Sequence, residues 1–190
     1  LGEDGEFYNC HQGKDFAAIT GLTKLDISQI PPMVARGVLI DVAKHLGVSH
    51  LSAAQPISTQ DLQSAMTEQK ITVREGDVIL LHTGYTDAFL EADPQLWGST
   101  IPGITNDAAR FLASLKPLAV GADTWGLGAV PPAPGDKVFY DHAILLKQNG
   151  IYILETMNTG RLAAEAVKEF MFVLGQARLK GEVQMVSNPV

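Results

Sequence analysis

His142 and Glu155 are the residues of this chain whose types and spacing most clearly allow chemistry, and both lie in the segment DHAILLKQNGIYILE. Residues 142–149 are predicted to form a short helix, because an apolar run is followed by polar residues. Gly150 then stands where the end of a helix favours a left-handed residue. Residues 151–154 are predicted to form a buried strand.

The predicted helix and strand have similar lengths, about 12 Å and about 13 Å. A strand that runs back along the helix would therefore bring His142 and Glu155 side by side. An imidazole and a carboxylate are ligands for zinc or manganese. The ordinary alternative is a residue at a helix start and a solvated carboxylate at a strand end.

Four further polar or aromatic residues follow apolar segments that are predicted to be buried strands. Thr83 and Tyr85 follow VILLH, and Asp123 and Trp125 follow PLAVGA. Ligands of open α/β sheets bind beyond the carboxyl ends of the strands, so these residues are predicted to line a substrate pocket. For Asp123 the alternative is a turn cap. His82 is more typical of a hydrogen-bonded core histidine than of a ligand.

Other titratable residues have structural explanations. Asp41 interrupts the apolar segment VLIDVA and would be costly to bury unpaired, so it is expected to face solvent or to pair with Arg36 or Lys44. Cys10 and His11 are adjacent, and adjacent side chains rarely point the same way. A nucleophilic Cys–His pair is therefore not expected.

Composition and missing motifs exclude several classes of protein. The net charge of −7, without a cluster of Lys and Arg, argues against a nucleic-acid partner. No apolar run approaches the length that crosses a bilayer, and the single cysteine favours a reducing compartment, the cytoplasm. GxSxG, P-loop, HExxH and GxGxxG patterns are absent, which argues against serine hydrolases, NTPases, zincins and dinucleotide-dependent enzymes. A small-molecule substrate is expected.

The elements that must position these residues alternate between strands and helices. Strands are predicted at 38–43, 78–82, 118–122, 151–154, 170–174 and 184–186, and helices at 59–69, 105–115, 142–149 and 161–167. Residues 84–103 and 123–140 are predicted to be irregular and to form active-site loops. A chain of 190 residues that is 46% hydrophobic fits one domain, and the pattern predicts an α/β fold with a mainly parallel or mixed sheet.

Six phrases in order resemble the cyclase family of metal-dependent hydrolases, which includes kynurenine formamidase and isatin hydrolase: PPMVARGVLIDVA, GDVILLHTGY, PGITNDAARFLASL, VGADTW, HAILLKQNGIYILE and FMFVLGQARLKGEVQM. The resemblance extends from about Phe7 onward. It implies a mixed sheet with barrel-like closure flanked by helices, a homodimer or homotetramer, and a zinc or manganese ion. It also implies hydrolysis of a C–N bond in a small aryl-formamide or cyclic amide by metal-activated water, with Tyr85 and Trp125 as apolar walls.

In that family a late His and Glu, matched here by His142 and Glu155, join the metal as ligands or as neighbours of ligands. The principal ligands come from an HxxTHxD motif, and a further His serves as acid and base. The sequence lacks that motif, which the resemblance places just before GEDGEFYN. Residues 1–190 are thus expected to form a single cyclase-like domain without the segment that carries it, and the catalytic His is expected upstream of Leu1. The alternative is a non-catalytic, metal-free binding or scaffold relative.

Overall fold

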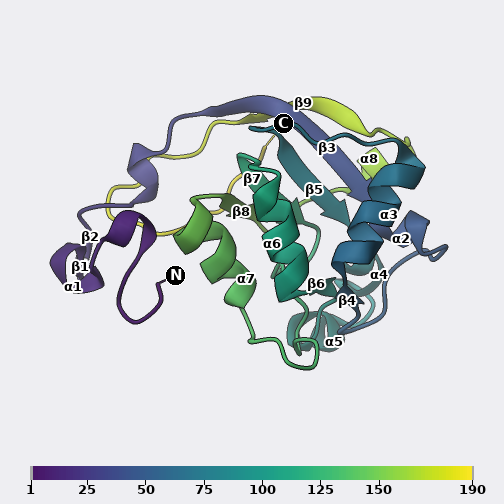
Figure 1. The fold of residues 1–190 in the computed structure, drawn as a ribbon, viewed down its shortest axis with the longest axis horizontal. Helices are drawn as coiled ribbons and strands as arrows, with labels where there is room; N and C mark the ends of the chain where they lie inside the picture. The colour runs from purple at the N-terminus through teal and green to yellow at the C-terminus, as the bar shows by residue number, and fades with distance from the viewer. Residues whose placement is uncertain (1, 190) are drawn as a thin grey trace.

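A five-stranded mixed sheet forms the centre of the protein, whose residues 2–189 are described by a computed structural model (Figure 1). The strand order is β8-β7-β5-β3-β9, and the first four strands are mutually parallel while β9 pairs antiparallel with β3. The bounds are β3 Met33–Asp41, β5 Val78–His82, β7 Ala119–Ala122, β8 Tyr152–Leu154 and β9 Glu169–Leu174. The predicted mixed α/β fold is confirmed. The sheet has two edges, β8 and β9, so the described part of the chain shows no closed barrel.

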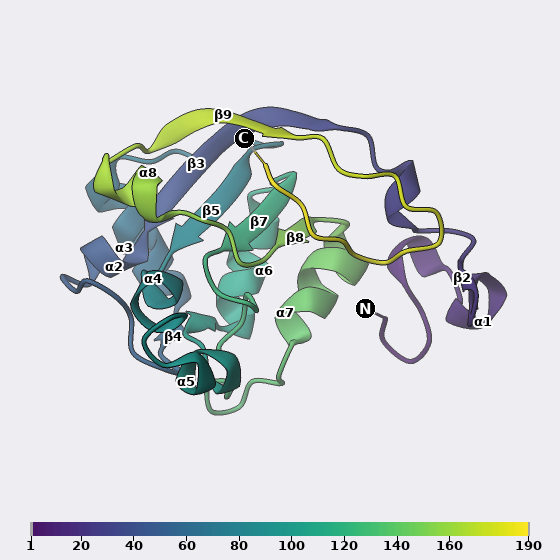
Figure 2. The same cartoon turned by 180° about the vertical axis from the view of Figure 1, so that it is seen from behind.

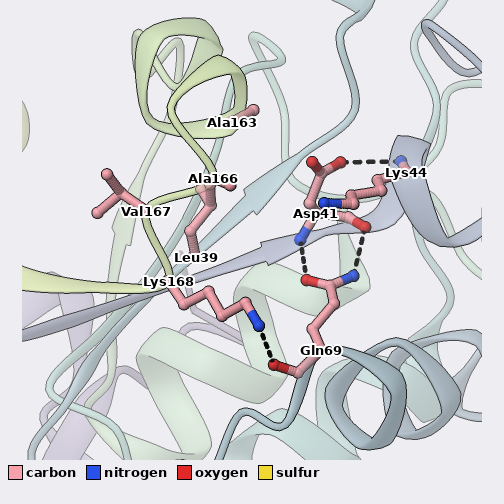
Figure 3. A pocket seen from close by; sticks show the side chains of 8 residues that line it. All are labelled: Leu39, Asp41, Lys44, Gln69, Ala163, Ala166, Val167 and Lys168. Atoms are coloured by element: carbon pink, nitrogen blue, oxygen red, sulfur yellow. Dashed lines mark hydrogen bonds between the residues drawn. The ribbon is translucent and has the colours of Figure 1, made fainter.

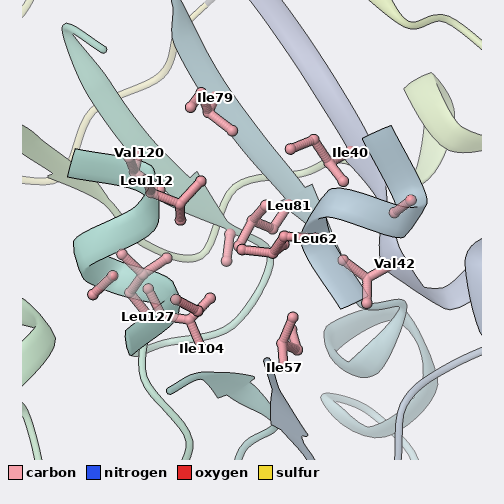
Figure 4. Close-up of a cluster of buried hydrophobic side chains, with 14 of the residues drawn as sticks. Ile40, Val42, Ile57, Leu62, Ile79, Leu81, Ile104, Leu112, Val120 and Leu127 are labelled. Atoms are coloured by element: carbon pink, nitrogen blue, oxygen red, sulfur yellow. The ribbon is translucent and has the colours of Figure 1, made fainter. Parts of the chain in front are cut away.

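Helices cover one face of this sheet and bury the main core against it (Figures 1 and 4). They are α2 (Val42–His45), α3 (Thr59–Gln69), α6 (Asn106–Ser114), α7 (Tyr140–His142) and its π-helical continuation η3 (Ala143–Gln148). The core joins strand residues such as Leu81 and Val120 to helix residues such as Leu62 and Leu112. The opposite face carries the short helix α8 (Gly160–Ala164) and a smaller cluster around Leu80 and Phe172.

Side-chain caps set where the helices begin. Ser58 and Asp61 form a capping box at α3, and Thr105 accepts a hydrogen bond from the Ala108 N–H at the start of α6. Strand β3 ends earlier than the predicted 38–43, because Asp41 accepts a hydrogen bond from the Lys44 N–H and so begins α2. The sequence predicts that Asp41 faces solvent or pairs with Arg36 or Lys44. Asp41 does contact Lys44, but through the backbone N–H of that residue and not through its charged side chain.

The structure differs from the prediction in two segments, the irregular segment predicted at 84–103 and the strand predicted at 184–186. Residues 84–103 contain the helices α4 (Tyr85–Phe89) and α5 (Pro94–Ser99), followed by a two-stranded parallel pair of β6 (Gly103–Ile104) with β4 (Pro56–Ile57). Asp93 caps α5 and Pro94 occupies its first turn, a start signal that is visible in the sequence. The prediction of a strand at 184–186 is wrong, because those residues form no regular secondary structure.

The N-terminal elements lie at one end of the molecule, and the segment that follows β9 runs out alongside them (Figures 1 and 2). The N-terminal part contains η1 (Tyr8–Cys10), α1 (Gly13–Phe16), the hairpin β1 (Ala17–Ala18) and β2 (Gly21–Leu22), and η2 (Ile27–Gln29). Backbone hydrogen bonds join it to the C-terminal segment, from the Leu22 N–H to the Gly181 carbonyl and from the Ile27 N–H to the Glu182 carbonyl. Among the helices of residues 2–189, none is long and apolar enough to span a membrane.

Candidate functional site

Titratable residues stand at the carboxyl end of every parallel strand. Asp41 and His82 are the last residues of β3 and β5, while Asp123 and Glu155 directly follow β7 and β8. Because parallel strands share one carboxyl edge, the four side chains are collected along the same edge of the sheet. The sequence predicted this grouping for Asp123 and the residues after β5, and the strand register produces it.

The fold brings His142 and Glu155 together. Helix α7 and η3 run away from His142, Gly150 turns the chain with a φ of +65°, and β8 returns to Glu155. The His142 Nε2 and the Glu155 Oε1 are 3.0 Å apart. The predicted left-handed residue at Gly150 and the predicted return of the strand are both observed.

A buried carboxylate lies behind the histidine. Asp141 is 1% exposed, and its Oδ2 lies 3.1 Å from the His142 Nδ1, although neither atom has a hydrogen bond of good geometry. Asp141 packs over Gly128, where a Cβ would lie only 2.8 Å from Oδ1. Burial opposes the charge on His142, but the carboxylates of Asp141 and Glu155 outweigh it and raise the His142 pKa to about 9.

The three side chains fit one part of a metal site. Asp141 and Glu155 contact opposite edges of the His142 ring, so they do not converge on one point. Within residues 2–189, no group of three or more His, Cys, Asp or Glu side chains is placed to hold a metal ion. The Nε2 and Oε1 atoms do converge, and a carboxylate behind the second nitrogen is the usual partner of a metal-binding histidine. The set therefore fits two ligands and the carboxylate that orients one of them.

The predicted pocket residues Thr83 and Asp123 form a separate buried network. The Thr83 N–H and Oγ1 donate to the Asp123 Oδ1 at 2.9 Å and 2.8 Å. The His82 Nδ1 lies 2.8 Å from the Thr159 Oγ1 and 3.9 Å from the Asp123 Oδ2, which has no hydrogen-bond partner. Burial raises the pKa of Asp123, and the hydrogen bonds from Thr83 and the charge of His82 only partly oppose this shift. His82 is 8% exposed, as expected for a hydrogen-bonded core histidine.

This network and the His142–Glu155 pair point to opposite faces of the sheet. Side chains alternate along a strand. Ala122 belongs to the core on the helix side, so Asp123 points away from the helices, whereas Leu154 belongs to the opposite cluster, so Glu155 points towards them. The structure thus keeps the predicted metal pair apart from two of the predicted pocket residues.

The aromatic pocket residues are packed and hydrogen-bonded. Tyr85 is fully buried at the start of α4, and its hydroxyl lies 3.2 Å from the Thr100 Oγ1. Trp125 is half-buried, and its Nε1 donates to the Trp97 carbonyl at 2.6 Å. The Trp97 Nε1 donates in turn to the Thr86 Oγ1 at 2.9 Å, so these aromatic groups fasten the loop that contains α4 and α5.

Hydrogen bonds join several of the residues that line the small cavity beside Asp41 (Figure 3). It has a volume of about 20 Å³, close to that of one water molecule. Gln69 exchanges two hydrogen bonds with the backbone of Asp41, and Lys168 donates to the Gln69 carbonyl. This cavity does not include any of the predicted site residues.

Sequence reasoning missed Asp141, although it stands next to His142. An Asp–His neighbour pair is a weak signal, because only the entry of the chain into α7 decides whether the Asp side chain turns inward. It also missed Phe139, whose ring lies edge-on to the His142 ring at a centroid distance of 5.7 Å.

Comparisons with known proteins agree with this fold. The family model described as "Putative cyclase" matches residues 9–129, more than half of the chain. A crystal structure described as that of a novel cyclase superposes with a TM-score of 0.89 at 26% identity, covering 100% of this chain and 64% of that chain. No curated protein shows significant similarity to the chain.

Isatin hydrolases share the fold at lower identity. Isatin hydrolase A from Ralstonia solanacearum matches with a TM-score of 0.65 and 17% identity, covering 90% of this chain and 63% of that chain. Isatin hydrolase A from Labrenzia aggregata, bound to benzyl benzoate, matches with a TM-score of 0.62 and 19% identity, covering 85% and 62%. The chain spans less than two thirds of the length of each of these three structures. Because the family model matches more than half of the chain, the chain belongs to the cyclase family.

Proposed function

We propose that this chain is part of a metal-dependent hydrolase that cleaves a C–N bond in a small aryl-formamide or cyclic amide. The observation that carries the proposal is the His142–Glu155 pair, whose Nε2 and Oε1 atoms meet at 3.0 Å in a member of the cyclase family. The fold shared with isatin hydrolases supports a hydrolase, and a further neighbour is described as a potential metal-dependent hydrolase with cyclase activity.

His142 and Glu155 would hold a zinc or manganese ion through Nε2 and a carboxylate oxygen. When bound, such an ion supplies a nucleophilic water near neutral pH and polarises the substrate carbonyl. Asp141, whose Oδ2 lies 3.1 Å from the His142 Nδ1, would favour a proton on Nδ1 through its negative charge, so that Nε2 is free to bind. The remaining ligands would come from an HxxTHxD motif upstream of Leu1, together with the histidine that serves as acid and base.

We further propose that the enzyme acts on its small-molecule substrate in the cytoplasm as a homodimer or homotetramer. Thr83, Tyr85, Asp123 and Trp125 stay in this proposal as the walls and supports of the substrate pocket. Given their burial, Thr83 and Asp123 would act by fixing the turn after β5.

Metal analysis of the full-length protein tests the proposal. We expect about one equivalent of zinc or manganese per subunit in the wild type, and affinity at least about tenfold lower for His142→Ala and Glu155→Gln. His45→Ala is the matched control, because His45 and Glu68 form another His–Glu pair, at 2.7 Å, that no part of the proposed site uses. A wild-type protein without divalent metal, or equal loss in the control, would contradict the proposal.

The alternative function is a non-catalytic binding or scaffold protein without metal. The observation that favours it is the ion pair itself, because a His142 with a pKa of about 9 between two carboxylates carries a proton that competes with a metal ion. The native sequence upstream of Leu1 discriminates between the two. An HxxTHxD motif there favours the hydrolase, and its absence favours the binding protein.

A further inference from the structure

We propose that Phe139 is a specificity-determining residue that provides the aromatic wall on which the ring of a planar aryl amide packs beside His142. The inference rests on the proposed function and adds to it a named residue and a preference for aromatic over aliphatic amides. Phe139 stands three positions before His142, at the point where the loop 123–140 enters α7.

The backbone at Phe139 is unusual for a bulky residue. Its φ of 55° and ψ of 19° are left-handed, a region that phenylalanine rarely adopts. Thr156, which directly follows Glu155, is also left-handed with a φ of 56°. Glu155 is thus adjacent to a residue in a rare conformation, and His142 follows one by three positions. Such residues concentrate at binding sites where the surrounding structure imposes them.

The ring of Phe139 is in contact with the site. Its centroid lies 5.7 Å from that of the His142 ring, at an interplanar angle of 88°, which is the edge-to-face arrangement of aromatic pairs. It also approaches Gly126, where a Cβ would lie 3.7 Å from the Phe139 Cε1. The ring therefore neighbours both the imidazole and the turn that follows Trp125.

Much of this ring is nevertheless open to solvent. Phe139 is 42% exposed and the preceding Val138 is 51% exposed, whereas Asp141, two residues later, is 1% exposed. Aromatic side chains together with a few placed polar groups are the side chains that line small-molecule sites, and Phe139 and His142 provide one of each kind. A planar ring can stack on Phe139 at centroid distances of about 4.5–7 Å, which keeps an amide attached to that ring near His142. A saturated ring or an alkyl chain lacks the aromatic part of this contact.

Binding of two unreactive neutral amides to the full-length protein tests the inference. The probes are benzamide and cyclohexanecarboxamide, and the readout is the NMR signal of the His142 ring. We expect the wild type to prefer benzamide by about two- to tenfold, the range of an aromatic pair. Phe139→Ala and Phe139→Leu should abolish the preference and Phe139→Tyr should keep it. Val138→Ala is the matched control, since it removes a neighbouring exposed apolar group and should keep the preference.

Several results would overturn the assignment of Phe139. One is a preference for benzamide that is as large in Phe139→Leu as in the wild type. Another is a loss of that preference in Val138→Ala as large as in Phe139→Leu. The third is an NMR signal of the His142 ring that does not shift when benzamide is added. If Phe139→Ala fails to fold, Phe139→Leu decides, because it keeps an apolar side chain of similar reach. Hydrolysis of formanilide by the same protein is measured separately. A Phe139-dependent benzamide preference without hydrolysis would support the binding wall and contradict the proposed function.

Discussion

Asp123 is a buried carboxylate with one satisfied and one unsatisfied oxygen. Thr83 supplies two hydrogen bonds to Oδ1, while Oδ2 faces His82 across 3.9 Å without a hydrogen bond. Desolvation disfavours the charged form of this group, and for that reason its pKa lies above the ordinary value of 3.8. The hydrogen bonds between Thr83 and Asp123 support the turn after β5. Because Asp123 Oδ2 lacks a partner, the stability that this support provides depends on the protonation of Asp123.

We expect Asp123→Asn to change how stability depends on pH. The folded wild type binds its proton more tightly than the unfolded chain, so its unfolding free energy falls as pH rises from 3.8 through the raised pKa. The amide introduced by Asp123→Asn keeps an oxygen that can accept from Thr83 and has no charge to bury. The variant should therefore match the wild type below about pH 4 and exceed it by about 1 kcal/mol or more near pH 7. Urea unfolding over this pH range measures the difference; a wild type that gains stability relative to the variant as pH rises would show that attraction to His82 dominates.

The element that carries His142 is held at its far end by the N-terminal segment. The Nζ of Lys147 in η3 lies 3.5 Å from the Glu3 carboxylate and 3.2 Å from that of Glu6. Gly150 accommodates the ring of Tyr8, because any Cβ there would lie 2.6 Å from that ring. The N-terminal segment is thus fastened to η3, the helical segment that follows His142.

Removal of the charge of Lys147 should loosen this attachment. We expect Lys147→Gln to speed amide hydrogen exchange of residues 3–8 by about two- to fivefold, since partly exposed ion pairs contribute little each. The contacts of Tyr8 with Gly150 remain, so the segment should stay docked. Arg161→Gln serves as the control, because Arg161 pairs with Glu165 at 2.8 Å on the exposed helix α8, on the opposite face of the sheet. Unchanged exchange in Lys147→Gln would mean that Tyr8 alone holds the segment.

Across the whole molecule, one sheet separates two cores of unequal size. The larger core lies under α3, α6 and η3, and the smaller one lies on the face that carries α8 (Figures 1 and 4). Strands β3, β5 and β7 contribute side chains to both cores, so the two cores share the same strands. The candidate site lies at the carboxyl edge of that sheet, so the larger core supports its geometry.

Truncation in the larger core should destabilise the whole protein. Leu81 is 1% exposed and belongs to the central strand β5, so Leu81→Ala is expected to lower the unfolding free energy by about 2–5 kcal/mol. Val186→Ala is the control, because Val186 is 97% exposed and its loss should change stability by less than about 0.5 kcal/mol. Denaturant unfolding measures both. A loss below about 1 kcal/mol in Leu81→Ala would contradict the central place of β5 in the core.

Local patterns predicted most of the elements because their causes are local. The apolar runs of β5 and β7, the Ser58 capping box, the Thr105 cap and the left-handed Gly150 are each visible within a few residues. The prediction failed where the deciding contact is distant or weak. Residues 184–186 have the composition of a strand, but no neighbouring strand pairs with them.

The sequence by itself determined the mixed α/β class, the family and the meeting of His142 with Glu155, because a helix, a glycine turn and a returning strand of matched length are all encoded within one segment. Only the tertiary structure decided what surrounds that pair. Asp141 turns inward because Gly128, which is distant in the sequence, has no side chain and leaves room for it. Asp123 and Glu155 face opposite sides of the sheet because side chains alternate from strand positions that the register fixes. Such contacts join residues from separate segments, and no local pattern specifies them.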